Sequence, residues 1–135
     1  MSDVAVTVRW EDGMRFEAVG RGGVPVPVDG DAEAGPSPME SLLISLAACM
    51  GADVVDLLGK MRVSFDGLAV HVEGDRRSEL PRRYTAVRLT YETRGVPATE
   101  GAKLQRAIDL SRDKYCSVLH TLHPDLDVSI RVETG

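Results

Sequence analysis

Residues 37–61, "SPMESLLISLAACMGADVVDLLGKM", decide the fold of this chain. Ser37 offers a capping hydroxyl, Pro38 suits the first helical position and Glu40 lies in the first turn, so a helix is predicted to begin here. Apolar residues then recur at spacings of three, four or one, which makes one stripe along about six helical turns. The stripe consists of Met39, Leu42, Leu43, Leu46, Met50, Val54, Leu57, Leu58 and Met61. We expect this helix to be central and closely packed.

The segments around this helix predict strands, a second helix and turns. Alternation in residues 4–10 predicts a half-buried strand, with Val4, Val6, Val8 and Trp10 on its inner face. Other predicted strands cover residues 14–20, 24–28 (an edge strand, because proline cannot donate), 67–75, 84–95 and 125–133. Residues 99–115 predict an amphipathic helix, with a short turn over residues 116–122. We therefore expect one α+β domain over residues 1–135, with an antiparallel sheet packed on a long central helix.

Charge and composition argue against two classes of partner. The net charge is −5 and no run of Lys or Arg exceeds two residues, whereas phosphate binding needs a concentrated basic surface. The basic stretch over residues 75–83 is interpreted as a solvated hairpin tip. The long helix carries Asp53 and Asp56, each costing about 2.5–3.5 kcal/mol at a bilayer centre. We expect a cytoplasmic protein without a signal peptide, membrane or nucleic-acid partner, in which both cysteines are reduced at rest.

Cys49, in the middle of the long helix, admits two interpretations. A lone helical cysteine usually fills a core position. A reactive Cys49 would need a cation from elsewhere in the fold, because the helix dipole acts only over terminal turns and a charged Asp53 would raise a thiol pKa. Arg9, Arg15 and Arg21 are the candidates for that cation.

Cys116, the second cysteine, precedes the short segment "SVLHTL", whose N-terminus would lower a thiol pKa if the segment is helical. No Cys-x-x-Cys or His-x₃-His pair accompanies the two cysteines and three histidines, so no metal site is predicted. The chain also lacks a Gly-x-Ser-x-Gly elbow, a phosphate-cradling loop and a dinucleotide fingerprint.

Two motifs resemble one known family. "GPSPMESLLISLAACMGADVVDLLGKMRV" (35–63) resembles the central helix of the OsmC/Ohr family, the osmotically inducible and organic hydroperoxide resistance proteins. "AIDLSRDKYCSVLHTL" (107–122) resembles the family's second-cysteine segment. The order of elements is similar across nearly the whole chain, and the details after Cys49 resemble the OsmC-like branch.

The resemblance implies a thiol peroxidase that acts as an intertwined homodimer, with active sites at the subunit interface. Cys49 would attack the peroxide, Cys116 would resolve the sulfenic acid to a disulfide, and a dithiol such as a lipoyl group would restore both thiols. Arg15 is the first candidate for the activating cation and Arg9 the second, with Asp53 a candidate modulator of the thiol. No metal or bound cofactor is required.

One position departs from the family pattern. Hydroperoxide-resistance members carry a glutamate ten residues before the reactive cysteine, where this chain has Met39. Glu40 lies nine residues before Cys49, and nine steps of about 100° place it on the opposite side of a straight helix. Glu40 is therefore interpreted as a first-turn carboxylate.

Two other functions remain open from the sequence. The chain could be an OsmC-like dimer that binds a small apolar or redox ligand at its interface without efficient peroxidase turnover. It could also be a purely structural dimer with inert cysteines.

Overall fold

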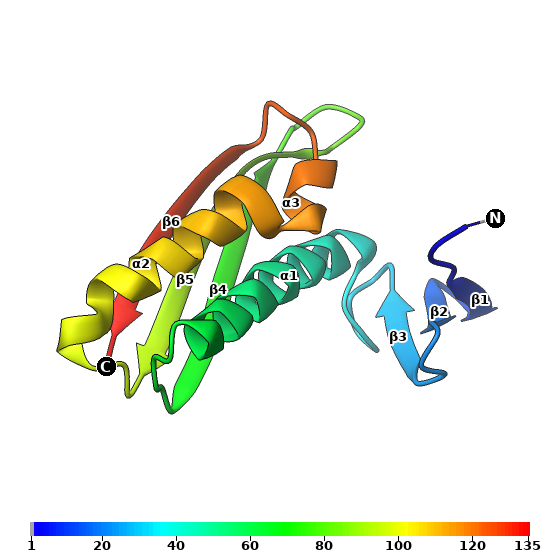
Figure 1. Ribbon diagram of the computed structural model, residues 1–135. Helices are drawn as coiled ribbons and strands as arrows, with labels where there is room; N and C mark the ends of the chain where they lie inside the picture. The colour runs from blue at the N-terminus through cyan, green and yellow to red at the C-terminus, as the bar shows by residue number, and fades with distance from the viewer. Residues whose placement is uncertain (1) are drawn as a thin grey trace. The chain divides into compact units, whose positions relative to one another are not determined.

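The computed structural model describes residues 2–135, which divide between Leu42 and Leu43 into two compact units (Figure 1). The first unit holds the N-terminal strands and the start of the long helix. The second holds the rest of that helix, a second sheet and the C-terminal helices.

The first unit is built on a three-stranded antiparallel sheet of order β1-β2-β3. The strands are β1 (Thr7–Asp12), β2 (Arg15–Val19) and β3 (Pro25–Asp29). Gly13 turns the chain between β1 and β2 with a φ of 51°, in the left-handed region that glycine tolerates. Since β3 pairs only with β2, its two prolines lie on an edge strand, as predicted.

The predicted half-buried face of the first strand is wrong in this chain. Val4, Val6, Val8 and Trp10 are 82%, 68%, 54% and 65% exposed, and the strand runs over Thr7–Asp12 rather than residues 4–10. Alternation predicts which side chains share a face, but burial requires a second layer on that face. Among the described residues of this unit, the only element besides the sheet is the first turn of the long helix.

The long helix α1 (Pro38–Lys60) begins where the sequence predicts. The Ser37 hydroxyl accepts a hydrogen bond from the Glu40 N–H at 3.1 Å, and the Glu40 carboxylate accepts one from the Ser37 N–H at 3.0 Å. This reciprocal pair is a capping box, which confirms Glu40 as a first-turn carboxylate. Within residues 2–135, α1 is the one helix with the length and apolarity of a membrane span, a test that core helices of soluble proteins also pass.

The second unit contains a mixed sheet of order β4-β5-β6. Its elements are β4 (Gly67–Arg76), β5 (Tyr84–Arg94), a short 3₁₀ turn η1 (Ala98–Glu100), α2 (Gly101–Leu110), a π-helical turn η2 (Ser111–Tyr115), α3 (Ser117–Thr121) and β6 (Asp127–Thr134). The β4–β5 hairpin is antiparallel as predicted, but β6 runs parallel to β5, so an all-antiparallel sheet is wrong. The reason is the helical crossover between β5 and β6, which returns the chain to the end where β5 began.

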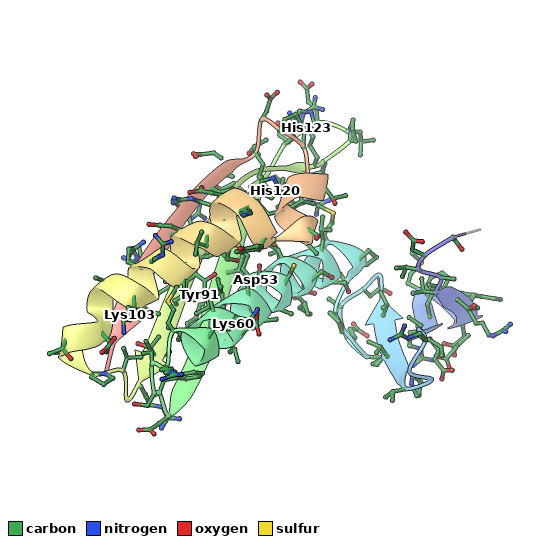
Figure 2. The ribbon with its side chains drawn as sticks, viewed as in Figure 1. Asp53, Lys60, Tyr91, Lys103, His120 and His123 are labelled. Carbon is green, nitrogen blue, oxygen red and sulfur yellow. The ribbon has the colours of Figure 1, made fainter. Side chains whose placement is uncertain are left out.

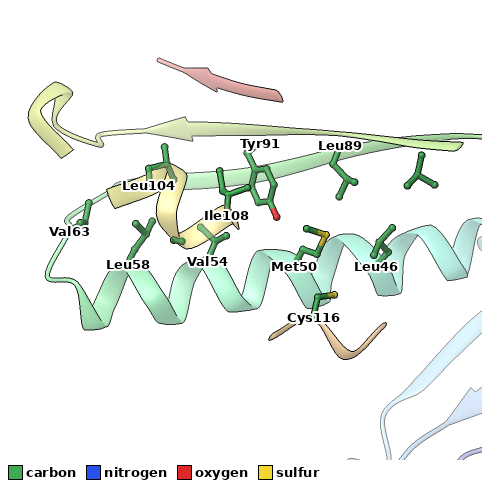
Figure 3. Close-up of a cluster of buried hydrophobic side chains, with 12 residues drawn as sticks. Leu46, Met50, Val54, Leu58, Val63, Leu89, Tyr91, Leu104, Ile108 and Cys116 are labelled. Atoms are coloured by element: carbon green, nitrogen blue, oxygen red, sulfur yellow. The ribbon is translucent and has the colours of Figure 1, made fainter. Parts of the chain in front are cut away.

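The core of the second unit lies between its sheet and its helices. Figures 1 and 3 show α1 and α2 on the same face of the sheet, with apolar side chains filling the space between. The fully or almost fully buried apolar side chains are Leu46, Met50, Val54, Leu58, Val63, Val87, Leu89, Tyr91, Leu104, Ala107, Ile108 and Cys116. Four of these come from α1 at spacings of four, so the stripe predicted from the sequence is confirmed from Leu46 onward.

Two adjacent valines of α1 allow the same substitution, valine to alanine, to be compared at a buried and an exposed position. Val54 is 0% exposed and Val55 is 47% exposed. We expect Val54→Ala to lower the free energy of unfolding by about 2 kcal/mol, because two buried methyl groups leave a cavity. Val55→Ala should lower it by clearly less than Val54→Ala, because Val55 fills no space in the core of its own chain. Urea denaturation followed by circular dichroism measures both, and equal losses would contradict the packing described.

Candidate functional site: two cysteines beside a carboxylate

Cys49 and Asp53 lie one turn apart on α1 and therefore on the same side of the helix. Both side chains are half-buried, so solvent reaches this part of the helix. The next turn towards the C-terminus carries the exposed ion pair of Asp56 and Lys60, at 2.9 Å. Cys49 and Asp53 thus belong to a band between the apolar core and the solvated face.

The π-helical turn η2 brings the second cysteine to the same place. The Cys116 N–H donates to the Ser111 carbonyl at 2.9 Å, a bond between residues five apart. Residues five apart lie about 140° from each other around an α-helix, whereas the wider π turn stacks them. The sequence predicted an α-helix over residues 99–115, and its last five residues depart from that prediction. The departure puts Ser111 and Cys116 on one side, facing α1.

Three ligand-type atoms converge at this meeting of α1 and η2. The Cys49 sulfur, the Cys116 sulfur and a carboxylate oxygen of Asp53 all lie within 4.8 Å of one another. The Ser111 hydroxyl donates to Asp53 Oδ2 at 2.9 Å and holds the carboxylate in place. Both thiols are free, and Cys116 is fully buried next to the α1 turn that carries Met50 (Figure 3).

Burial is the main cause of the raised pKa of Cys116. It raises the pKa of the Cys116 thiol to about 11, and the Leu119 N–H, which donates to the sulfur at 3.3 Å, only partly opposes that rise. The neighbouring Cys49 thiol and the Asp53 charge raise the pKa further. Cys116 is therefore a neutral thiol at neutral pH.

Tyr91 of β5 completes the site from the sheet side. Its side chain is 0% exposed, and its hydroxyl has no hydrogen-bond partner among the described residues. Burial raises the pKa of Tyr91, and the charges of Cys116 and Asp53 raise it further, because the phenol lies near both (Figure 2 labels Tyr91 and Asp53).

The structure brings together three of the residues singled out from the sequence: Cys49, Asp53 and Cys116. Arg9 and Arg15 belong to β1 and β2 of the other unit, where Arg15 Nε donates to Asp12 Oδ1 at 2.6 Å. Sequence reasoning missed Ser111 and Tyr91. Nothing in the sequence marks Ser111, which lies inside a helical pattern, and the alternation of β5 makes Tyr91 look like ordinary core.

The chain is similar in sequence and in structure to several known proteins. The family profile described as OsmC-like protein matches residues 29–131. Protein YhfA of Escherichia coli K12 is 33% identical over 123 residues, which cover 90% of this chain and 91% of that protein. A hypothetical protein from Aquifex aeolicus has a similar structure, with a TM-score of 0.86, 28% identity and coverage of 100% and 98%. The organic hydroperoxide resistance protein OhrB of Bacillus subtilis shares the fold at a TM-score of 0.65 and 17% identity, with 98% of each chain covered.

The raised pKa of Cys116 predicts a pH profile. A thiol with a pKa of about 11 stays protonated through the range in which an ordinary cysteine ionises, near 8.5. We expect the ¹³Cβ shift of labelled Cys116 to titrate well above pH 8.5. Asp53→Asn should move the midpoint down, because it removes a negative charge beside the thiol.

The exposed Asp56 provides the control for this titration. Asp56→Asn changes the net charge of α1 by the same amount but should leave the Cys116 midpoint where it was. A Cys116 midpoint near 8.5 in the folded wild-type chain would show that the thiol is not desolvated as described.

Proposed function

Because the chain belongs to the OsmC-like protein family, we propose that it is a thiol peroxidase that reduces organic hydroperoxides or hydrogen peroxide. The observation that supports this most directly is the approach of two free sulfurs from separate elements, within 4.8 Å of each other. Two thiols at that separation can be joined by small side-chain movements, which a redox pair requires.

The different exposure of the two cysteines supports the assignment of their roles. Cys49 is half-buried and can meet a peroxide, whereas Cys116 is fully buried and protonated. The Cys49 thiolate attacks the distal peroxide oxygen, the O–O bond breaks, and the leaving alkoxide takes a proton to become an alcohol. Cys116 then attacks the Cys49 sulfenic acid, which forms the disulfide and releases water.

Asp53 acts in the second step as a modulator of the resolving thiol. Cys116 must lose its proton as it attacks, and its raised pKa makes that loss difficult without a nearby acceptor. The Asp53 carboxylate, held by Ser111, is an acceptor within 4.8 Å of both sulfurs. The proton passes through this carboxylate to the departing hydroxide, which leaves as water, and the carboxylate ends the step with the charge it began with.

A dithiol reductant closes the cycle. Reducing the Cys49–Cys116 disulfide requires two electrons and two protons, which a lipoyl dithiol supplies through a mixed disulfide with the more accessible sulfur, Cys49. We place this cycle in the cytoplasm, where thiols are kept reduced.

We also propose that the protein works as a homodimer, supported by two apolar surfaces. In the first unit, Val4, Val6, Val8 and Trp10 are more than half exposed. In the second unit, a shallow groove of about 330 Å³ runs beside α1. The groove is lined by Ala47, Ala48, Gly51, Ala52, Val55, Leu68 and Val70. A second copy that covers such surfaces would remove them from water, which is the main driving force for association.

The peroxidase proposal is tested by counting thiols. The reduced chain treated with one equivalent of cumene hydroperoxide should lose both thiols and gain an intrachain disulfide, detected by mass spectrometry without reductant. Cys116→Ser should instead accumulate a sulfenic acid on Cys49 that a dimedone probe captures. Cys49→Ser should react far more slowly, since Cys116 is buried and protonated. Two intact thiols per chain after exposure would sink the proposal.

The activating cation is tested by comparing two arginines of the first unit. A thiolate beside a guanidinium is stabilised, so we expect Arg15→Ala to slow the reaction of Cys49 with peroxide at least tenfold. Arg9→Ala should have the smaller effect, and the reverse order would move the role to Arg9. Sedimentation of each variant provides the control, with an expected mass of twice 14.6 kDa. A single-chain mass for the wild type would contradict the dimer.

A further inference from the structure

We propose that the reduced dithiol and Asp53 together bind one thiophilic divalent cation, of which Zn²⁺ is the natural example. Cys49, Asp53 and Cys116 present two sulfurs and a carboxylate oxygen within 4.8 Å of one another. Thiolate and carboxylate are both ligands that Zn²⁺ takes in proteins. The proposal does not depend on peroxide chemistry, because it needs only the reduced cluster.

The spacing of the three atoms fits a four-coordinate cation. Tetrahedral Zn²⁺, with Zn–S of about 2.3 Å and Zn–O of about 2.1 Å, sets its ligand atoms roughly 3.6–3.8 Å apart. The three atoms need to close by at most about 1 Å, which is within reach of small χ rotations. Cys49 and Asp53 form a chelating pair one turn apart on a single helix, and Cys116 arrives from the π turn. Three protein ligands leave the fourth position for a solvent molecule.

Two buried hydroxyls support the site from behind. Ser111 donates to Asp53 Oδ2 at 2.9 Å, which orients the carboxylate in the way that outer-shell partners orient metal ligands. Tyr91 is fully buried, the charges of Cys116 and Asp53 act on its phenol, and its hydroxyl has no partner among residues 2–135. A buried phenol without a partner is costly, whereas a bound thiolate or a metal-bound water would satisfy it.

Cation binding and disulfide formation exclude each other at this cluster. Binding releases one proton from each thiol to solvent and offsets the charges of two thiolates and a carboxylate with two positive charges. A two-electron oxidant such as a hydroperoxide takes two electrons from the sulfurs and two protons from solvent. The products are the disulfide, an alcohol, water and the free cation. The cation therefore protects the reduced dithiol, and oxidation releases the cation.

The sequence gives no sign of this site because its two cysteines lie 67 residues apart (116 minus 49). Zinc sites are recognised in a sequence by short motifs of cysteines and histidines, and this chain has no Cys-x-x-Cys or His-x₃-His pair. Asp53 supplies the near neighbour that a second cysteine usually supplies, and the crossover brings in Cys116 from 63 residues further along the chain (116 minus 53).

The test is a metal titration of the full chain, reduced and freed of metal under anaerobic conditions. Zn²⁺ in competition with a chromophoric chelator should bind at one per chain. Co²⁺ should give a thiolate-to-cobalt charge-transfer band with the visible spectrum of a four-coordinate ion. Cys49→Ser should abolish the band, and Asp53→Asn should weaken binding at least tenfold. The oxidised chain should not bind.

Matched variants separate this site from surface binding. Asp56→Asn removes an exposed carboxylate from the same helix and should leave the affinity unchanged. His120→Ala with His123→Ala removes two exposed histidines near the C-terminal end of the second unit and should also leave it unchanged. Because Cys49 and Asp53 are only half-buried, their variants keep the test valid if Cys116→Ser fails to fold.

The proposal is overturned if the reduced wild-type chain takes up no cation. It is equally overturned if Asp53→Asn binds as tightly as Asp56→Asn, or if the histidine variant loses the cation. These outcomes are independent of the peroxide assay, which is run on metal-free protein. If the chain binds Zn²⁺ but keeps both thiols after treatment with peroxide, the cation site is supported and the peroxidase proposal is contradicted.

Discussion

The site depends on one constraint, the π-helical turn that aligns Ser111 with Cys116 against α1. The turn exchanges an α-helical bond for the Cys116 N–H to Ser111 carbonyl bond at 2.9 Å, and so keeps the buried backbone paired. The same turn lets the Ser111 hydroxyl reach Asp53 at 2.9 Å. A hydrogen bond to a charged group contributes about 1.5–3 kcal/mol, while a desolvated carboxylate left without a partner costs more. The hydrogen bond between Ser111 and Asp53 therefore helps to fix the position of the Cys116 sulfur.

The same hydrogen bond holds the Asp53 carboxylate beside the two thiols, where access to water is restricted. If both thiols ionised beside Asp53, three negative charges would share a space less than 5 Å across. Part of that charge is relieved by keeping Cys116 protonated, as its raised pKa requires. The other ways to remove it are to join the sulfurs or to bring in a cation. The proposed redox chemistry and the proposed cation binding would therefore each reduce the negative charge at this cluster.

Most of the scaffold could be predicted from the sequence, because it follows from local patterns. The apolar stripe and the Ser37–Glu40 cap specify α1, and alternation specifies the β4–β5 hairpin. Patterns within a segment do not say what covers it, which is why Val8 and Trp10 were expected to be half-buried. They also do not set the direction of β6, which is decided by the length of the crossover. Cys49 and Cys116 could be paired only through resemblance to a family, and Ser111 and Tyr91 carry no local signal at all.

The exposed apolar face of the first unit connects the proposed dimer with the proposed activation of Cys49. Val4, Val6, Val8 and Trp10 of this unit are more than half exposed, so a second copy that covers them would remove apolar surface from water. This unit also carries Arg9 and Arg15, the cations proposed to activate Cys49. In the proposed dimer, covering this sheet and bringing a guanidinium to Cys49 would occur together. Under that proposal, the guanidinium of the first unit would reach the half-buried Cys49 only in the assembled dimer.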